Sequence, residues 1–312
     1  MKTHTLFLAA GLLALAPLSS HAKIVRTVEK SFTVQPGGLL QVETQGGDVV
    51  VQSSNDSVVK VTAREKIRAG SEAEADEILQ KLALTIEQSA KGVTATAVYE
   101  KGTGFHFGSW PSVQVDFTVT VPTNYNVDLK TSGGDVSVGD LMGKVVARTS
   151  GGDVTLGKIS GDIHAGTSGG NVKLAEGLGS VKLGTSGGDI HVGRAVGPTD
   201  LDTSGGNIEI KSVENTLDAS TSGGDVSAGI AGAFKGDCKL RTSGGRVRVM
   251  VDKSAAFDLD ASTSGGDVDA TGLTITIDRG GSGCSRLSGK VNGGGPALKL
   301  RSSGGDIVVQ TR

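Results

Sequence analysis

The chain has 312 residues and a formal net charge of −2, which becomes −3 once Lys2 is removed with the N-terminal segment described below. Binding of nucleic acid requires a basic surface, so this near-neutral balance argues against nucleic acid as a partner. Aromatic residues make up only 3% of the chain, whereas glycine contributes 49 residues. Because a conventional large core needs more bulky side chains, the composition predicts a repetitive fold with a thin core.

The first 22 residues have the features of a secretory signal peptide. Lys2 gives a positive start, residues 6–16 form an apolar run, and the sequence SSHA supplies small residues before a cleavage point after Ala22. The apolar run is too short to cross a bilayer, and no later apolar stretch approaches transmembrane length. We therefore expect residues 1–22 to be removed. The mature chain is expected to be exported to the periplasm, the extracellular space or the cell surface, without an integral membrane segment.

Residues 23–125 are expected to form an N-terminal β region with one helix. Residues 46–49 already read Gly-Gly-Asp-Val between alternating apolar residues, which indicates an early, irregular coil or sheet. A helix is predicted at about residues 71–90, because Ser71 and Glu74 form a capping box and Gly92 marks an end. The residues of its apolar face are Ile78, Leu79, Leu82 and Ile86. This helix would cap the open end of the β structure that follows.

A short segment gathers aromatic side chains in a chain that has few of them. Tyr99, Phe105, Phe107 and Trp110 fall within twelve residues that also contain three glycines. One interpretation is an apolar plug for the N-terminal region. The other is an exposed loop that binds a sugar, a peptide or a partner surface. These four residues are therefore the tentative ligand-binding residues.

From residue 126 onward the sequence repeats the motif TSGGDV or a close variant. Its opening threonines lie 18 residues apart from Thr131 to Thr221, and two steps of 21 residues follow, to Thr242 and Thr263. A step of 39 residues then leads to Ser302. Strict recurrence of this kind is the signature of a solenoid, in which each repeat packs on its neighbours.

Apolar residues stand in columns when the repeats are written beneath one another. Five and seven residues after each threonine, as at Val136 and Val138, every position is apolar, and a spacing of two is typical of a strand. A weaker apolar pattern recurs fourteen and sixteen residues after the threonine. The fold predicted is all-β: residues 126–312 form a parallel β-solenoid, or β-helix, with coils of 18–21 residues that each contain two short strands.

The same alternation assigns the residues of the motif to a corner. The threonines are expected to point inward and to bond the backbone or the neighbouring coil. The glycine pairs, such as Gly133 with Gly134 and Gly151 with Gly152, are expected to make the turn. Glycine takes positive φ without strain, and it lets stacked backbones approach closely.

An outward column of Asp and Asn follows the glycine pairs. Asp135, Asp153 and Asp189 belong to it, and stacked coils would bring such carboxylates close enough for a calcium ion. However, calcium-binding β-rolls use a motif with a third glycine that is missing here. The column also contains Asn171 and Arg246, which reduce charge repulsion. Turn capping is therefore favoured, and a calcium-stabilised structural rod is the alternative.

The two cysteines, Cys238 and Cys284, fit no zinc-binding or redox spacing. An exported protein permits a disulfide between them. Stacking the coils in sequence order places them about two rungs, or roughly 9.6 Å, apart, beyond the usual reach of a disulfide unless irregular loops close the gap. The pair is a possible disulfide, and two unpaired small residues are the alternative.

Three segments together resemble a known family. They are the repeated TSGGDV, the strand VQVDFTVTVP that precedes it, and the terminal VNGGGPALKLRSSGGDI. The chain resembles the bacterial putative-adhesin family of exported β-solenoid proteins over nearly all of its mature length. The resemblance implies an envelope or extracellular protein with an adhesive role, and it supplies no catalytic residues.

We therefore expect a non-enzymatic, exported cell-envelope protein: an adhesin, or a binding or scaffold module, that needs no cofactor. Its partner would be an envelope or extracellular ligand, either a protein or a glycan. A polysaccharide-active β-helix enzyme is a second alternative beside the calcium-stabilised rod. Such an enzyme needs paired carboxylates, or a carboxylate with Lys or Arg, in a groove, and no such cluster stands out in the sequence.

Overall fold

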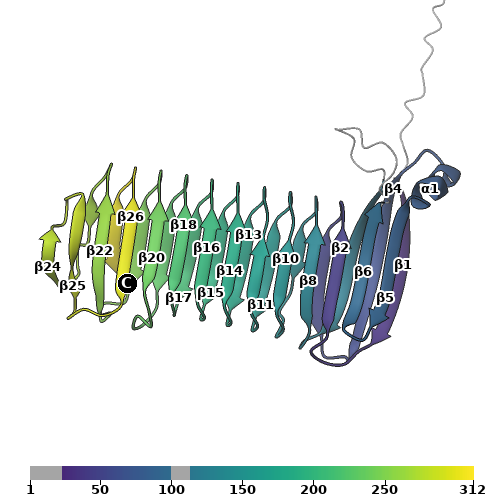
Figure 1. The fold of residues 1–312 in the computed structure, drawn as a ribbon, viewed down its shortest axis with the longest axis horizontal. Helices are drawn as coiled ribbons and strands as arrows, with labels where there is room; N and C mark the ends of the chain where they lie inside the picture. The colour runs from purple at the N-terminus through teal and green to yellow at the C-terminus, as the bar shows by residue number, and fades with distance from the viewer. Residues whose placement is uncertain (1–22, 100–112) are drawn as a thin grey trace, which may run out of the picture.

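The computed structural model describes residues 23–99 and 113–312, and these residues form a rod of two β-sheets that face each other (Figure 1). Within them, sheet A has 13 strands and sheet B has 14. The strands stand side by side along the rod, and one short helix lies at its N-terminal end. The predicted all-β fold, a β-solenoid with long parallel sheets, is confirmed.

In spatial order, sheet A consists of β1 (Lys23–Thr33), β4 (Val58–Arg68), β7 (Val113–Pro122), β3 (Val49–Ser54), β9 (Val136–Val138), β11 (Val154–Ile159), β13 (Val172–Gly177), β15 (Ile190–Ala195), β17 (Ile208–Val213), β19 (Val226–Ile230), β21 (Val247–Val251), β27 (Ile307–Thr311) and β23 (Val268–Asp269). Sheet B consists of β24 (Ile275–Gly280), β25 (Arg286–Val291), β22 (Phe257–Thr263), β26 (Ala297–Ser302), β20 (Cys238–Thr242), β18 (Leu217–Thr221), β16 (Thr199–Thr203), β14 (Val181–Thr185), β12 (Ile163–Gly166), β10 (Val145–Arg148), β8 (Asn126–Thr131), β2 (Leu39–Thr44), β6 (Gly92–Tyr99) and β5 (Leu82–Ser89). Helix α1 spans Glu72–Leu79.

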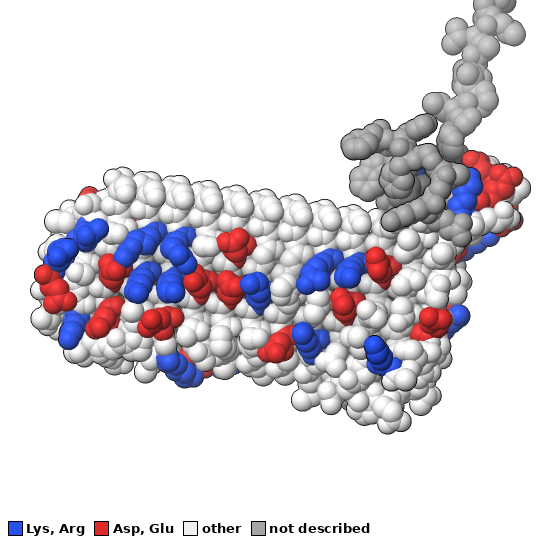
Figure 2. Space-filling model, in the orientation of Figure 1, with Lys and Arg blue, Asp and Glu red and all other residues white. Residues whose placement is uncertain are grey.

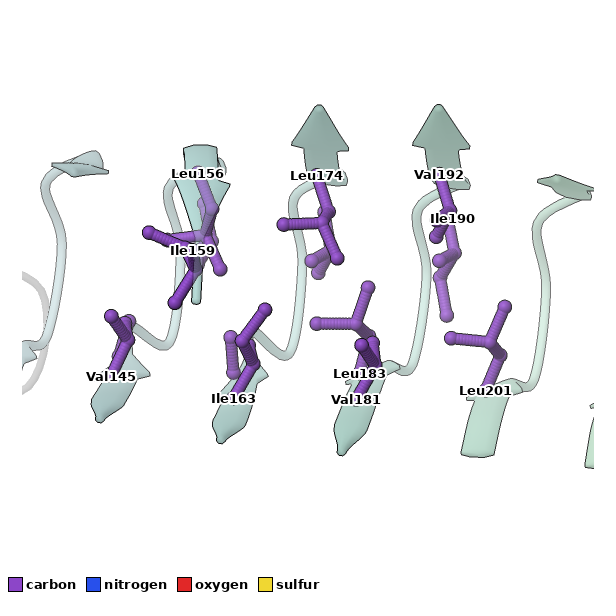
Figure 3. Packing of buried hydrophobic residues seen from close by; sticks show 14 of the residues in the cluster. Val145, Leu156, Ile159, Ile163, Leu174, Val181, Leu183, Ile190, Val192 and Leu201 are labelled. Atoms are coloured by element: carbon purple, nitrogen blue, oxygen red, sulfur yellow. The ribbon is translucent and has the colours of Figure 1, made fainter. Parts of the chain in front are cut away.

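Each regular coil adds one strand to each sheet. β11 pairs in parallel with β9 and β13, so that Val154 lies opposite Val136 and Val172. The same in-register pairing continues along both sheets, and it turns each apolar column of the sequence into a stack of side chains on an inner face. Figure 3 shows these stacks extending from both sheets into the space between them. All three valines have 0% exposed surface, so the core is thin but fully shielded from solvent at these positions.

The threonine column lies inside the rod, as predicted. The nine Thr and Ser residues that open the motif between residues 131 and 302 are all buried. Each hydroxyl joins two coils: Thr149, for example, donates to the carbonyl of Gly134 at 2.8 Å and accepts from the N–H of Gly152 at 3.3 Å. A buried hydroxyl needs such partners, and here the repeat supplies both from its own backbone.

Of the two reasons predicted for the corner glycines, the close approach of stacked backbones is confirmed and positive φ is wrong. The glycines with positive φ do not include Gly133, Gly134, Gly151 or Gly152, so conformational freedom is not what selects them. A Cβ at Gly152 would instead lie 2.2 Å from the carbonyl oxygen of Gly134 in the preceding coil. At Gly151 it would lie 3.5 Å from the nearest atom, an ordinary contact. In this pair the second glycine is therefore the one fixed by the stacking of the coils. Farther along the rod the first glycine is also tightly placed, since a Cβ at Gly223 or Gly244 would lie 2.9 Å from a carbonyl oxygen of the preceding coil.

The predicted helix at residues 71–90 is wrong in its second half. Helix α1 ends at Leu79, and residues 82–89 form β5, which pairs antiparallel with β6. Leu82 and Ile86 are spaced by four, which places them on one face of a helix and also on one face of a strand. The strand satisfies the backbone through its ladder with β6, and the predicted cap at the other end is confirmed, since Ser71 Oγ accepts the N–H of Glu74 at 3.2 Å.

The N-terminal end of the rod is closed by β1, β5 and α1. Arg26 of β1 donates to Glu72 at 2.8 Å and to Asp76 at 2.7 Å, both on α1. Lys30, also on β1, donates to the backbone carbonyl of Ile86 in the opposite sheet at 2.8 Å. Charged side chains thus cross between the sheets where the apolar core ends, which blunts the edge of the sheet.

The coils at the C-terminal end are not stacked in sequence order. β26 lies between β20 and β22 in sheet B, and β27 lies between β21 and β23 in sheet A. Leu298 of β26 consequently lies opposite both Cys238 and Leu259. The final coil of the chain is therefore inserted between two coils that precede it in the sequence.

Candidate functional site

The aromatic residues proposed to bind a ligand are only partly covered by the structure. Phe105, Phe107 and Trp110 lie outside the described residues. Tyr99 ends β6 and is half-buried, and burial raises the pKa of its hydroxyl despite an opposing contact with the backbone of Val113. Its side chain packs against the core. Tyr99 itself therefore serves the packing of the N-terminal region.

The Asp and Asn column caps the corners, as favoured from the sequence, but each side chain caps the next coil rather than its own. The N–H of Asp153 donates to Asp135 Oδ1 at 2.8 Å, and the N–H of Asn171 donates to Asp153 Oδ1 at 2.7 Å. Asp189 likewise accepts the N–H of Asn207 at 2.7 Å. Within residues 23–99 and 113–312, no three or more His, Cys, Asp and Glu side chains are grouped so that they could hold a metal ion.

The possible disulfide is not formed, and both cysteines are free. Cys238 is buried in β20, where desolvation raises the pKa of its thiol to about 11. Cys284 is exposed and forms a bridge with Val268, at the end of the rod beyond the inserted C-terminal coil. The insertion adds a rung between the two thiols, and they lie farther apart than sequence-order stacking predicts.

The outer face of sheet B carries many charged side chains. Figure 2 shows Lys and Arg alternating in blocks with Asp and Glu over this face. The blocks follow from the register of the strands, because outward residues of successive coils stand side by side. Lys130 lies opposite Arg148, and His164 lies opposite Lys182, which in turn lies opposite Asp200.

Two open grooves hollow this face. The first, of about 450 Å³, is lined by residues of β14, β16, β18 and β20, including Lys182, Asp200 and Asp218. The second, of about 320 Å³, is lined by residues that include Arg148, His164 and Gly166. Lys182 and Asp200 border both grooves, which therefore lie next to each other and are together called the depression.

On this face some charged side chains form ion pairs and others do not. Lys182 Nζ lies 2.9 Å from Asp200 Oδ2, and this contact raises the pKa of the lysine. Lys130 and Arg148 make no ion pair with any described residue. The pKa of His164 is lowered by partial desolvation and by the nearby cations Arg148, Lys182 and Lys144. The structure thus brings together a cluster of cations whose members are far apart in the sequence.

This cluster was missed at the level of sequence, although its signal was present. Writing the repeats in their 18-residue register places Lys130, Arg148, Gly166 and Gly184 in one outward column of sheet B. The same register places His164 and Lys182 side by side in the neighbouring outward column. The arrangement suits binding: Lys182 is held protonated by Asp200 and is a poor base, and the depression is open to solvent along its length.

A second charged line crosses the C-terminal ends of strands β11, β13 and β15 of sheet A, and its charges are paired. Glu176 lies between Lys158, at 3.0 Å, and Arg194, at 2.5 Å. Arg194 also contacts Glu214 at 2.6 Å. The signs alternate from coil to coil, which lowers the pKa of Glu176 and raises that of Arg194 through these hydrogen bonds. The ion pairs of this line explain its charges as a stabilising network, whereas Lys130 and Arg148 on sheet B have no ion pair that would explain theirs.

In the part of the chain that the structure describes, no helix has the length and apolar character to cross a membrane. Comparison with curated proteins gave no match. Among solved structures, a putative adhesin from Bacteroides fragilis is 13% identical, with 92% of this chain and 97% of that one covered and a TM-score of 0.41. A putative lipid binding protein from Parabacteroides distasonis is 12% identical, with coverage of 91% and 96% and a TM-score of 0.44.

A putative adhesin from Parabacteroides merdae is 11% identical, with 92% of this chain and 97% of that one covered and a TM-score of 0.33. The model of the family described as Toastrack DUF4097 matches residues 39–310, which include the first coil, the whole repeat and the inserted C-terminal coil. The chain therefore belongs to the Toastrack DUF4097 family.

Proposed function

We propose that this protein is an exported, non-enzymatic binding module of the cell envelope, of the adhesin type. The observation that carries the proposal is the outer face of sheet B, where open grooves cross several coils beneath ordered rows of charged side chains. A shallow, elongated surface of this kind suits an extended ligand better than an enclosed small molecule. The names of the related structures, adhesins among them, agree with this proposal.

Export rests on the signal peptide predicted for residues 1–22. Strand β1, Lys23–Thr33, follows the predicted cleavage point and would be kept in the mature chain. N-terminal sequencing of the protein from periplasmic and culture fractions should find Lys23 as the first residue. Recovery of an intact Met1 in the cytoplasm would contradict this part of the proposal.

The binding role is tested by sedimentation of the mature protein with isolated envelope fractions: peptidoglycan, membrane vesicles and capsular material. We expect the protein to pellet with at least one fraction and to release no reducing ends from it. A protein that stays in solution with every fraction would contradict the proposal. Release of reducing ends would favour the enzyme, and a large rise in melting temperature with millimolar calcium would favour the calcium-stabilised rod.

The aromatic segment remains a second place where a ligand could bind. Replacing Phe105, Phe107 and Trp110 with serine should abolish sedimentation if this segment forms the contact. Unchanged sedimentation of a folded triple variant would exclude the segment and leave sheet B as the binding surface.

A further inference from the structure

We propose that Lys130, Arg148, His164 and Lys182 form a binding site for a linear anionic polysaccharide, one that carries carboxylates on its sugar rings. We refer to these four residues as the cationic row; Lys130, Arg148 and Lys182 carry its charge, and His164 contributes a hydrogen-bonding imidazole. The proposal rests on the proposed function, because it names the ligand class of the same face. It goes further because it places the contact on one set of coils and assigns a negative charge to the ligand.

The cationic row has one member on each of four successive strands. Lys130 on β8 lies opposite Arg148 on β10. On β12 the residue opposite Arg148 is Gly166, and His164 is the neighbouring outward residue, two positions earlier on the same strand. Lys182 on β14 lies opposite His164. Neighbouring strands are about 4.8 Å apart, so the four groups span roughly 14 Å. A polymer with one anionic group per monomer can meet such a row at regular intervals.

The first half of the cationic row forms no ion pairs, although Glu43 on β2 lies opposite Lys130. Lys130 and Arg148 are exposed, stand directly opposite each other and form no ion pair with any described residue. Like charges opposite one another on neighbouring strands destabilise a sheet. Like charges also stand opposite each other farther along sheet B, as Arg241 and Arg301 do. Those two arginines each have an ion-pair partner, Asp218 and Asp260 respectively, whereas Lys130 and Arg148 have none among the described residues. An unpaired guanidinium next to an ammonium group is suited to receive carboxylates from outside the protein.

Three members of the cationic row, Arg148, His164 and Lys182, line space for a ligand. Gly166 and Gly184 occupy outward positions beside His164 and Lys182, so no side chain covers the backbone there, and the groove of about 320 Å³ lies over these glycines. A Cβ at Gly184 would meet its nearest atom only at 3.7 Å. Packing therefore does not require a glycine at position 184, whereas a Cβ at Gly166 would lie 2.9 Å from the carbonyl oxygen of Gly184.

The row ends at an acidic block. Asp200 and Asp202 stand on the next strand, β16, and a polyanion that continued along the rod would be repelled there. The protein as a whole is near neutral, which disfavours binding driven by bulk charge alone. The site is thus limited to about four monomers of an extended chain, since one monomer would occupy each rung.

The test uses the full mature chain and polygalacturonate, with neutral dextran as the uncharged probe and polyphosphate as a polyanion without sugar rings. We expect polygalacturonate to bind, dextran not to bind, and binding to weaken as salt is added. The double variant Lys130→Gln/Arg148→Gln should lose roughly fivefold to tenfold in affinity, the loss expected for two exposed ionic contacts. The matched variant Lys173→Gln/Lys211→Gln changes the same charge on the outer face of sheet A and should bind within about twofold of the unchanged protein.

Two further readouts locate the contact. The imidazole signals of His164 should shift in NMR spectra when polygalacturonate is added, while those of His191, on sheet A, should not. Gly184→Gln, which places a neutral side chain in the groove, should also weaken binding without lowering the melting temperature.

The outcomes of these binding tests separate the polysaccharide site from the proposed function. Equal affinity in the double variant and its control, or no binding of polygalacturonate at all, would overturn the inference. If the protein still pelleted with envelope fractions, the proposed function would stand without it. Polyphosphate binding as tight as polygalacturonate binding would contradict the assignment to a polysaccharide.

Discussion

The two glycines of each corner are adjacent in sequence and differ in what surrounds them. A Cβ at Gly152 would lie 2.2 Å from the carbonyl oxygen of Gly134 and 2.5 Å from Asp135 Oδ1, whereas at Gly151 it would meet nothing closer than 3.5 Å. We expect Gly152→Ala to lower the free energy of unfolding by about 1–3 kcal/mol through steric overlap. Gly151→Ala should change it by less than about 1 kcal/mol in either direction.

Urea unfolding of the two variants, followed by circular dichroism, checks this difference. Similar losses in both would contradict the assignment of the steric contact to Gly152 alone. The distinction could not be read from the sequence, because it depends on which of two neighbouring residues faces the preceding backbone.

His164 reports the cations around it. Desolvation and the nearby Arg148, Lys182 and Lys144 lower its pKa, so we expect it to titrate below the ordinary value of about 6.5. The folded state then binds fewer protons than the unfolded chain. The small stabilisation from this residue is present above the ordinary pKa and is lost as pH falls through the lowered one.

An NMR titration of the mature protein measures this pKa directly. Arg148→Gln should move the pKa of His164 upward, because one of the opposing cations is removed, and Lys173→Gln should leave it unchanged. A pKa of His164 that did not respond to Arg148→Gln would mean that the two side chains do not interact.

At the scale of elements, the strands of the repeat were predictable from the sequence, whereas only the first half of the predicted helix is helical. The strands follow from columns repeated in nine coils, so a misjudged residue in one coil is corrected by the others. The region 71–89 occurs once, and the spacing of Leu82 and Ile86 fits a strand as well as a helix. Nothing in the local pattern shows that β6 lies alongside to pair with it.

The line of alternating charges beside sheet A is another element-scale feature, and its contribution can be measured. Replacing Arg194 with methionine keeps the length of the side chain and leaves Glu176 and Glu214 facing each other without their shared cation. We expect a lower melting temperature, and a smaller difference in concentrated salt, which screens exposed charges. Lys173→Met, at a position on the same face without an ion pair among the described residues, is the control. Equal effects of the two substitutions would show that the line does not stabilise the rod.

The architecture of the whole molecule followed from the repeat, but the order of its coils did not. A strict period predicts that coils stack, and it carries no information on whether the last one is added at the end or inserted. Insertion places Leu298 opposite Cys238, whereas stacking in sequence order would place Leu259 there.

Engineered disulfides distinguish the two orders. With Cys284 replaced by serine, Leu298→Cys should form a disulfide with Cys238 on oxidative refolding, because directly opposed residues are about 4.8 Å apart. Leu259→Cys should not, since one strand lies between it and Cys238. Mass spectrometry without reduction checks both proteins, and a disulfide only in the Leu259→Cys variant would mean that the coils follow sequence order.

The candidate site was the least predictable part, because its residues are ordinary surface charges until the coils are stacked. The sequence drew attention to conspicuous features, the glycine-aspartate corner and the aromatic segment. The corner proved to be structural. The cationic row becomes visible only when Lys130, Arg148 and His164 are placed on neighbouring strands.

Lysine footprinting of the mature protein bound to envelope material tests most directly whether the outer face of sheet B is the binding surface. The free and bound protein are acetylated briefly, and the modified lysines are identified by mass spectrometry. We expect Lys130, Lys144 and Lys182 to be protected in the bound state, while Lys173 and Lys211 on the opposite face react as they do in the free protein. Protection confined to Lys173 and Lys211, or equal reactivity of all five lysines in both states, would contradict the assignment of binding to this face.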